Sequence, residues 1–247
     1  MKKVGRQRLD LLLVERGIAE TRQKAAAMIL AGEVSVDGKR AAKAGATVPQ
    51  TARLEVASRL QKYVSRGGLK LEGALEDLQV DPAGKVCLDL GASTGGFTDC
   101  LLQRGALRVF AVDVNVGQLA WKLQRDPRVV QVKRNARELR ASDLSEPVDL
   151  VVADVSFISV RKVLPASIAC TREGAQFLIL VKPQFELDRE DVGPGGIVTS
   201  RDLHIRAVES VRRAAEAVGL EPLGLEASRL AGAEGNQEYF LHLRKKA

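Results

Sequence analysis

The sequence has few of the residues that build metal and disulfide sites. Its 247 residues include only two histidines and three cysteines. The cysteines, Cys87, Cys100 and Cys170, are odd in number and form no Cys-x-x-Cys pair, which argues against a disulfide framework and for a reducing compartment. We therefore expect a cytoplasmic protein. A zinc site or a histidine-based catalytic centre is not expected either, so we predict no bound metal.

Long apolar runs are also missing. No apolar stretch is long enough to cross a bilayer, and the N-terminal run Leu11–Val14 ends at Glu15, too soon for the core of a signal peptide. We therefore expect no membrane partner.

Aromatic residues make up only 4% of the chain, and we expect Trp121, Tyr63 and Tyr239 to pack against other side chains rather than to stack on bases.

Positive charge is concentrated at one end of the chain. Residues 1–66 hold 14 lysines and arginines against 6 acidic residues, whereas the remainder holds 24 against 25. Such asymmetry favours a basic module that meets a polyanion, attached to a nearly neutral body. Nucleic acid is the leading candidate, and a solvated surface is the alternative.

Residues 8–57 show the pattern of a small α+β unit. The leucines of "RLDLLLVERG" and the run "TRQKAAAMILAG" predict two helices that end at Gly17 and Gly32, the second capped by Thr21. "EVSVDGKRAA" alternates and contains Asp37-Gly38, a hairpin turn signal, and "ARLEVA" predicts another strand. The basic residues expected to contact nucleic acid are Arg6, Arg8, Arg22, Lys24, Lys39, Arg40 and Lys43, with Arg66 further on.

This unit resembles the alpha-L RNA-binding motif, which is found in a small-subunit ribosomal protein and at the front of many pseudouridine synthases. The resemblance runs through "RLDLLL", "TRQKAAAMI" and "GEVSVDGK". It implies that residues 1–59 form a domain that binds structured RNA through phosphates contacted by lysine and arginine.

The rest of the chain predicts a linker and an α/β domain. "SRLQKYVSRGG" is charged and ends in paired glycines, so residues 60–68 are expected to be a linker, and "LKLEGALEDLQ" predicts a helix. Five apolar strands then alternate with helical patterns, which is typical of a doubly wound parallel sheet. The strands are "KVCLDLG", "RVFAVDV", "RVVQVKR", "VDLVVADV" and "AQFLILVK".

The end of the chain predicts an antiparallel strand pair, "EPLGLEASRL" and "QEYFLHLRKK", joined by "AGAEGN". A mostly parallel sheet with an antiparallel finish is the plan of class I methyltransferases. We therefore predict that residues 69–247 form a Rossmann-like domain that uses S-adenosyl-L-methionine.

The loop "LDLGASTGGFTD" follows the first of these strands and opens a helix, so a ligand can approach its glycines closely. A P-loop would need lysine where Phe97 stands, and a dinucleotide fingerprint would need G-x-G-x-x-G. An S-adenosylmethionine loop remains, with a simple tight turn as the alternative. Asp113 can accept both ribose hydroxyls, Asp89 can face the cofactor's ammonium or sulfonium through water, and Asn135 can contact adenine. The predicted cofactor-binding residues are Asp89, Gly91, Ser93, Gly95, Gly96, Phe97, Asp113, Asn135 and Asp154.

Two polar residues end buried strands at the edge where open α/β sheets bind ligands. Asp154 ends the strand in "VVADVSF" and Lys182 ends that in "FLILVKPQFE". They are expected to pair, either as a structural salt bridge or as groups that act on a substrate. "DVSF" lacks the Pro-Pro-aromatic motif of amino-directed DNA methyltransferases, and no cysteine follows a proline as in carbon-directed pyrimidine methyltransferases. An acceptor oxygen assisted by lysine remains.

Five motifs together look like the TlyA-type (hemolysin A family) ribosomal RNA 2′-O-methyltransferases: "SRGGLKL", "DLGASTGGFTD", "DVSFIS", "VKPQFE" and "GNQEYF". That family joins an alpha-L domain to a methyltransferase domain of the RrmJ/FtsJ type. Its Lys-Asp-Lys-Glu tetrad falls here on Lys70, Asp154, Lys182 and Glu238. Thr94 stands where relatives in the wider superfamily often have proline, which leaves the glycine pair intact. The resemblance implies methyl transfer from S-adenosyl-L-methionine to a cytidine 2′-hydroxyl of ribosomal RNA, in one or both ribosomal subunits.

We expect Lys182 to position the hydroxyl and stabilise its developing charge. The two acids would orient the lysines, and Lys70 would complete the cage. Lys182 could act as a general base only if neutral, and the sequence leaves its charge open. Phe157 is a better candidate for stacking on a base than the tryptophan and the two tyrosines. The loop "GPGGIVTS" is either a lid or a surface loop. An arginine stripe or solvated helix face is expected at Arg134, Arg137 and Arg140.

Two other functions compete with methyl transfer. The chain could be a catalytically silent RNA-binding or ribosome assembly factor, which the intact tetrad argues against. The hemolysin name of the family suggests a pore-forming toxin. The sequence shows no secretion signal, membrane span or amphipathic barrel pattern to support a toxin.

Overall fold

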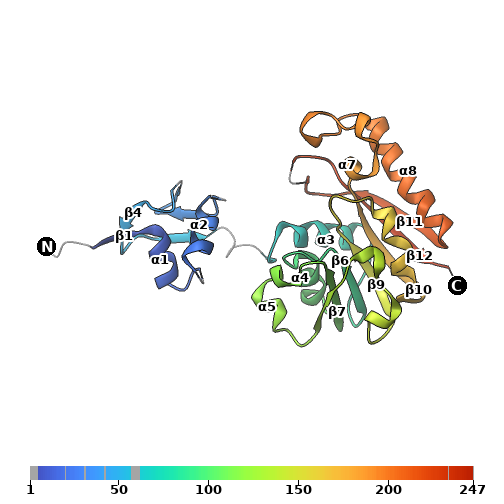
Figure 1. Ribbon diagram of the computed structural model, residues 1–247, viewed down its shortest axis with the longest axis horizontal. Helices are drawn as coiled ribbons and strands as arrows, with labels where there is room; N and C mark the ends of the chain where they lie inside the picture. Colours follow the sequence, from blue (N-terminus) through green and yellow to red (C-terminus); the bar gives the residue numbers. More distant parts are fainter. Residues whose placement is uncertain are drawn as a thin grey trace. The chain divides into compact units, whose positions relative to one another are not determined.

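The computed structural model describes residues 5–19, 21–30, 32–41, 43–56, 62–232 and 234–246. The chain forms two units, Met1–Lys62 and Tyr63–Ala247, and each is described by itself (Figure 1).

The first unit packs two helices with short strands around a small apolar core. Leu9, Leu13 and Ile29 are fully buried there. The Thr21 hydroxyl accepts a hydrogen bond from Lys24 N at 3.1 Å, as expected of a helix cap. β1 pairs with β4, and β3, β2 and β5 form a second antiparallel sheet. The elements are β1 (Arg6–Arg8), α1 (Leu9–Glu15), α2 (Arg22–Leu30), β2 (Val34–Val36), β3 (Lys39–Arg40), β4 (Thr47–Pro49) and β5 (Leu54–Val56).

The second unit contains a seven-stranded sheet in the order β11-β12-β10-β9-β6-β7-β8. β12 runs antiparallel to both of its neighbours, and the other pairings are parallel. The predicted class I methyltransferase sheet is therefore confirmed. The helices and strands are α3 (Arg66–Asp77), β6 (Val86–Leu90), α4 (Gly96–Gln103), β7 (Arg108–Asp113), α5 (Trp121–Gln124), β8 (Val129–Lys133), β9 (Val148–Ala153), α6 (Leu164–Ile168), β10 (Thr171–Val181), α7 (Pro183–Glu186), α8 (Arg201–Ala217), β11 (Leu220–Ala227) and β12 (Tyr239–Lys245).

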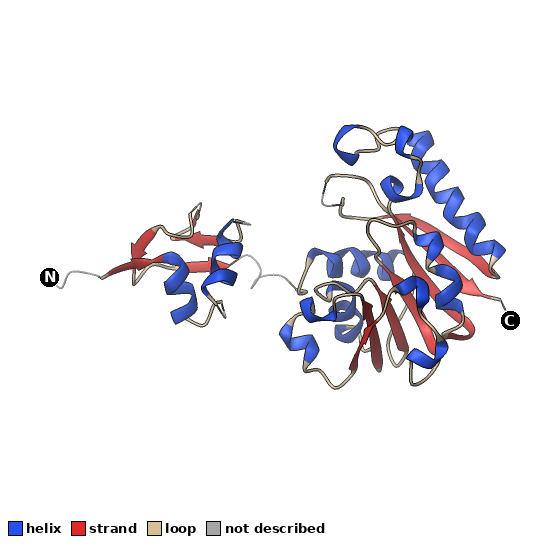
Figure 2. Ribbon diagram, viewed as in Figure 1, coloured by secondary structure: helices blue, strands red, loops and turns tan. Residues whose placement is uncertain are grey.

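Alternate strand residues enter two apolar layers, one on each face of the sheet. On one face, Leu88 and Phe177 pack with α6 and α8. On the other, Cys87 and Leu178 pack with α3, α4 and α5. Figure 2 shows the sheet with helices on both sides. All three cysteines lie within the described residues, where they are buried and form no disulfide.

Two expectations about this unit are wrong. Residues 66–68 are not linker, because they form the first turn of α3. A Cβ on Gly68 would lie 2.3 Å from Tyr63 Cβ, so this glycine permits close packing rather than flexibility. Residues 60 and 61 of the expected linker lie outside the described residues. Trp121 is not a packing residue; it is 57% exposed, with Arg125 stacked 3.9 Å from its ring centroid.

Within the described ranges, no helix is long and apolar enough to span a membrane. The same residues contain no cluster of three or more histidine, cysteine or acidic side chains that could hold a metal ion.

Candidate active site

The candidate site lies at the carboxyl ends of the central parallel strands, where open α/β sheets bind ligands. β6 runs into the glycine loop, and β7 ends at Asp113. Asp154 directly follows β9, and Lys182 directly follows β10. Because Val181 pairs with Tyr239 across the sheet, Glu238 lies at this same edge.

Strand alternation directs three of these side chains to one face of the sheet. Asp154, Lys182 and Glu238 each stand two residues from a strand side chain that packs in the layer containing α3. Those packed side chains are Val152, Leu180 and Phe240. Lys70 lies in α3 itself. The alternation of side chains along the strands therefore places the two acids and Lys182 beside α3, the helix that carries Lys70.

The four predicted catalytic residues form two ion pairs. Lys70 Nζ donates to Glu238 Oε2 at 2.5 Å, and Lys182 Nζ lies 2.5 Å from Asp154 Oδ1. The second contact is not aligned as a hydrogen bond. Lys182 instead donates to Ser156 Oγ at 2.9 Å, a partner that the sequence did not indicate.

Three of the four side chains are largely removed from water, and the side chain of Asp154 is 25% exposed. Lys70, Lys182 and Glu238 are 8%, 9% and 2% exposed. Desolvating two charges can cost more than their attraction returns, so buried pairs are weak evidence for stability. Their place in a cleft at the ligand-binding edge favours a functional reason for keeping them.

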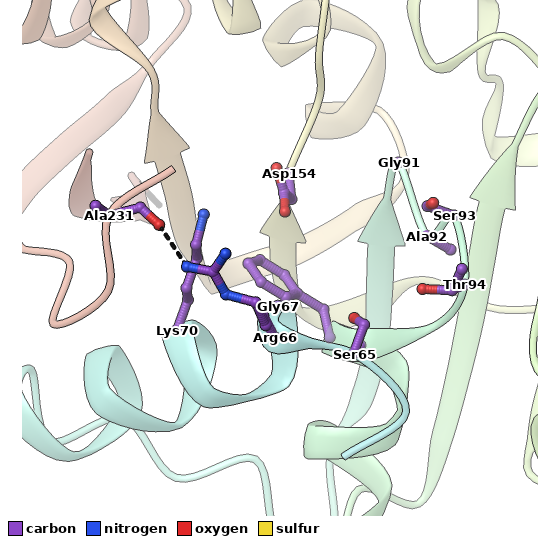
Figure 3. A pocket seen from close by; sticks show the side chains of 12 residues that line it. Ser65, Arg66, Gly67, Lys70, Gly91, Ala92, Ser93, Thr94, Asp154 and Ala231 are labelled. Atoms are coloured by element: carbon purple, nitrogen blue, oxygen red, sulfur yellow. Dashed lines mark hydrogen bonds between the residues drawn. The ribbon is translucent and has the colours of Figure 1, made fainter. Parts of the chain in front are cut away.

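A cavity of about 200 Å³ separates the first turn of α3 from the glycine loop. Figure 3 shows Lys70 and Arg66 rising from α3, Asp154 extending from the end of β9, and Gly91 to Thr94 on the far side. Arg66 Nη2 donates to Ala231 O at 3.3 Å. Arg66, predicted to contact RNA, therefore borders this cavity in the second unit.

A second cavity, of about 450 Å³, shares Gly91, Ser93 and Asp154 with the first. Asp113 and Asn135 also line it. The Asp113 carboxylate accepts hydrogen bonds from the backbone N–H groups of Ser93 and Asn115, both at 2.9 Å. Asn135 Oδ1 caps a short 3₁₀ turn by accepting from Arg137 N at 3.1 Å. The two cavities meet at the glycine loop and the end of β9.

Residues 63–245 match the family model described as FtsJ-like methyltransferase. The chain belongs to the FtsJ-like methyltransferase family. Residues 7–54 match the S4 domain. The motif-based resemblance is therefore confirmed. The protein is a methyltransferase joined to an RNA-binding S4 domain.

Relatives of this FtsJ-like methyltransferase carry two kinds of name. It is 51% identical over 241 residues to the 16S/23S rRNA (cytidine-2′-O)-methyltransferase TlyA of Mycobacterium tuberculosis, covering 97% of this chain and 90% of that one. It is 38% identical over 237 residues to Hemolysin A of Brachyspira hyodysenteriae, covering 95% and 98% of the two chains. A solved structure from Streptococcus thermophilus, named as a hemolysin, is 39% identical with a TM-score of 0.77, covering 99% and 90%.

Each glycine of the FtsJ-like loop occupies its position for a different structural reason. Gly91 has φ +84°, and a Cβ there would lie 2.5 Å from Asp154 O, so only glycine lets the ends of β6 and β9 approach. Gly95 has φ +96° and packs against Leu123. Gly96 lines the smaller cavity together with Phe97, whose ring also stacks in the core. Cofactor contact by these residues stays a prediction.

Asp89 is completely buried beneath the FtsJ-like loop. Its Oδ2 accepts from Thr98 Oγ1 at 2.6 Å. Its Oδ1 has no hydrogen-bond partner within the described structure. Burial raises the pKa of this carboxyl to about 7, opposed by the hydrogen bond from Thr98. A role for Asp89 in holding the cofactor's ammonium stays a prediction.

The expected arginine stripe is interrupted. The residues that follow Asn135 form separate short 3₁₀ turns rather than one helix. Arg134 lines the larger cavity but is paired with Asp143 at 2.5 Å. A continuous helix face carrying Arg134, Arg137 and Arg140 is therefore wrong.

The loop "GPGGIVTS" is anchored to the segment that carries Glu238. Asn236, 1% exposed, accepts from Val198 N and donates to Gly196 O, both at 2.8 Å. His204 adds a ring-nitrogen contact to Val198 O at 2.8 Å. A hinged lid would have few such anchors, so the structure favours a fixed loop.

In the S4 unit, the buried Asp10 joins two of the arginines predicted to contact RNA. Arg8 donates to both carboxylate oxygens, at 3.0 and 2.7 Å, and Arg22 donates at 2.9 Å. The hydrogen bond from Arg8 is the main reason that the pKa of Asp10 lies well below its usual range. The other predicted residues of the unit are also exposed, and their use in RNA binding stays a prediction: Arg6, Lys24, Lys39, Arg40 and Lys43.

Proposed function

We propose that this protein transfers a methyl group from S-adenosyl-L-methionine to the 2′-hydroxyl of a cytidine in ribosomal RNA, acting in the cytoplasm. The observation that carries the proposal is the set of two ion pairs, the buried Lys70–Glu238 and the partly buried Lys182–Asp154, beside the glycine-loop cavities. The 51% identity to a protein named as a cytidine 2′-O-methyltransferase supports it. Ribosomal RNA, alone or within a subunit, is the proposed partner.

The residues around the larger cavity fit the proposed cofactor. Gly91 lines this cavity and has no side chain, so a ligand would meet bare backbone there. Asp113 lies at the strand end where a carboxylate can bind ribose hydroxyls, and Asn135 borders the same cavity. When bound, S-adenosyl-L-methionine supplies an electrophilic methyl group on a cationic sulfur.

The contacts of Lys182 suit a group that holds the acceptor oxygen. An ammonium has three N–H donors; one is directed to Ser156, and Asp154 holds the charge in place. A further donor can point to the ribose hydroxyl. As that hydroxyl passes its proton to water, an ammonium at Lys182 stabilises the charge that develops on the oxygen. Lys70, held by Glu238, would restrict the nucleotide from the α3 side.

The RNA itself would be held by two kinds of contact. Arg8 and Arg22 are exposed basic residues of the S4 unit that can contact phosphates. Phe157 lines the larger cavity beside Asp154, and its side chain is 90% exposed. Exposed aromatic rings in RNA-binding proteins commonly stack on an unpaired base. We assign Phe157 this role toward the target nucleotide.

The test measures transfer from radiolabelled S-adenosyl-L-methionine to free ribosomal RNA and to ribosomal subunits. Lys182→Ala should lower the rate at least about 100-fold, as expected for loss of an oxyanion donor, and leave cofactor affinity nearly unchanged. Lys85→Ala is the control, because Lys85 precedes β6 at the opposite edge and bonds Gln176 at 3.0 Å. A Lys182→Ala protein that methylates at the wild-type rate would refute the assignment.

The transfer assay and a vesicle-leakage assay together separate the rival functions. A wild-type protein that binds ribosomal RNA but transfers no label to any RNA would favour a silent assembly factor. Leakage of lipid vesicles at nanomolar protein would favour the membrane-damaging activity that the hemolysin name suggests. Neither rival explains the two ion pairs at the ligand-binding edge.

A further inference from the structure

A buried carboxylate outside the tetrad joins the two loops that carry Asp154 and Lys182. Glu186, the last residue of α7, is 6% exposed. Its carboxylate accepts from Ser159 Oγ at 2.6 Å, from Val160 N at 2.7 Å and from Arg161 Nε at 3.1 Å. All three donors belong to the segment that follows β9, whereas Glu186 belongs to the segment that follows β10.

These two segments already touch at their beginnings. There Lys182 contacts Asp154 and donates to Ser156. Midway along, the rings of Phe157 and Phe185 lie 5.7 Å apart, centroid to centroid. The contacts of Glu186 close the far end. The two loops are therefore joined near the strands, between the aromatic rings, and at Glu186.

The backbone of Phe157 shows what this arrangement holds in place. Its φ is +66°, in the left-handed region that a bulky side chain rarely adopts. Such a conformation persists only where the surrounding structure determines it. Its ring is mostly exposed, so burial does not fix it. The fixed points are Ser156, bonded to Lys182, on one side and Ser159, bonded to Glu186, on the other.

Burying a charged carboxylate at position 186 costs desolvation free energy. Burial raises the pKa of Glu186, and the hydrogen bonds from Ser159, Val160 and Arg161 oppose that shift only in part. Arg161 also donates to the backbone oxygen of Glu186 at 3.2 Å. A carboxylate with several donors from one loop suits the fixing of that loop better than general stabilisation, which apolar packing would supply without this cost.

We propose that Glu186 is a positioning residue for methyl transfer. By joining the segments after β9 and β10 at their far ends, it fixes Phe157 toward the target nucleotide that Lys182 addresses. This inference rests on the proposed function. It adds a residue that touches neither cofactor nor nucleotide and acts through the loop that does.

The test compares Glu186→Gln and Glu186→Ala with a matched control, Asp149→Asn. Asp149 also accepts a backbone N–H, from Val86 at 2.9 Å, but does so at the opposite end of β9. We expect Glu186→Ala to lower kcat/KM for ribosomal RNA by about tenfold or more, since misplaced reacting groups lose rate steeply. Glu186→Gln should lose less, because its amide oxygen still accepts one bond. Cofactor affinity should stay within about threefold of wild type in both, and Asp149→Asn should keep wild-type kcat/KM.

A double-mutant cycle separates positioning from a general structural role. In a Phe157→Ala background, Glu186→Ala should lower kcat/KM by less than about twofold further, because the ring that Glu186 positions is gone. Costs that multiply, or a Glu186→Gln protein with the activity of Asp149→Asn, would overturn the proposal. A wild-type protein without methyl transfer would instead overturn the proposed function, so the two failures differ.

Discussion

Replacing Lys70 by methionine would leave Glu238 buried without its cation. The two side chains are only 10% and 3% exposed, and their charged atoms lie 2.5 Å apart. Removing one partner of such a pair typically costs about 3–5 kcal/mol, because the remaining charge is uncompensated. For a domain of this size, each kcal/mol lowers the melting temperature by about 2–4 °C. We therefore expect Lys70→Met to melt at least about 6 °C below wild type.

The double replacement Lys70→Met with Glu238→Met should recover most of that loss. Apolar side chains of similar volume often replace a buried ion pair at little or no cost. Methyl transfer should stay absent, because the chemistry needs the charged groups. The double variant should therefore regain stability without regaining activity. That result is expected of an ion pair that is retained for function rather than for stability.

The assay follows unfolding of the second unit alone, since the chain has a single tryptophan, Trp121, and it lies there. Tryptophan fluorescence against temperature gives the melting point of each variant. Arg229→Met serves as control, because Arg229 pairs with Asp77 at the surface and its loss should change melting little. A double variant as unstable as the two single losses combined would refute the reasoning.

Three further predictions concern the cofactor loop and the S4 unit. Between about pH 4 and the raised pKa of Asp89, about 7, stability should fall as pH rises, because the unfolded chain loses this proton first; Asp89→Asn should flatten the curve measured by urea unfolding. Gly95→Ala should lower the melting temperature and the cofactor affinity measured by calorimetry, since its Cβ would lie 2.2 Å from Leu123 Cδ1 at φ +96°. Arg8→Ala and Arg22→Ala should each weaken binding to ribosomal RNA and reduce the slope of log affinity against log salt by about 1.

Local signals predicted local structure well. Thr21 caps α2, and Asp37 and Gly38 both adopt positive φ in the turn between β2 and β3. These features depend on neighbours in sequence, so a short stretch suffices to predict them. The paired glycines before Lys70 led to the wrong prediction of a linker, because glycine is common both in flexible segments and where backbones pack closely. Only the position of Tyr63 against Gly68 decides between the two.

The site was predictable where strand ends and motifs define it. Asp154 and Lys182 follow apolar strands, and their alternation places both on the α3 side. Ser156, Glu186 and Asn236 were not predicted as site residues, because the partners described above lie 25 or more residues away and no local pattern indicates such contacts. Long-range polar contacts of this kind require the folded chain.

The chemical identity of the methylated nucleoside tests the central claim most directly. The protein would be incubated with S-adenosyl-L-methionine carrying a deuterated methyl group and with unmethylated ribosomal RNA. The RNA would then be digested to nucleosides for mass spectrometry. We predict deuterated 2′-O-methylcytidine from the wild-type protein and at most about a hundredth of that amount from Lys182→Ala in the same time. A label on a base, or no label in any nucleoside, would contradict the assignment of Lys182 to a ribose hydroxyl.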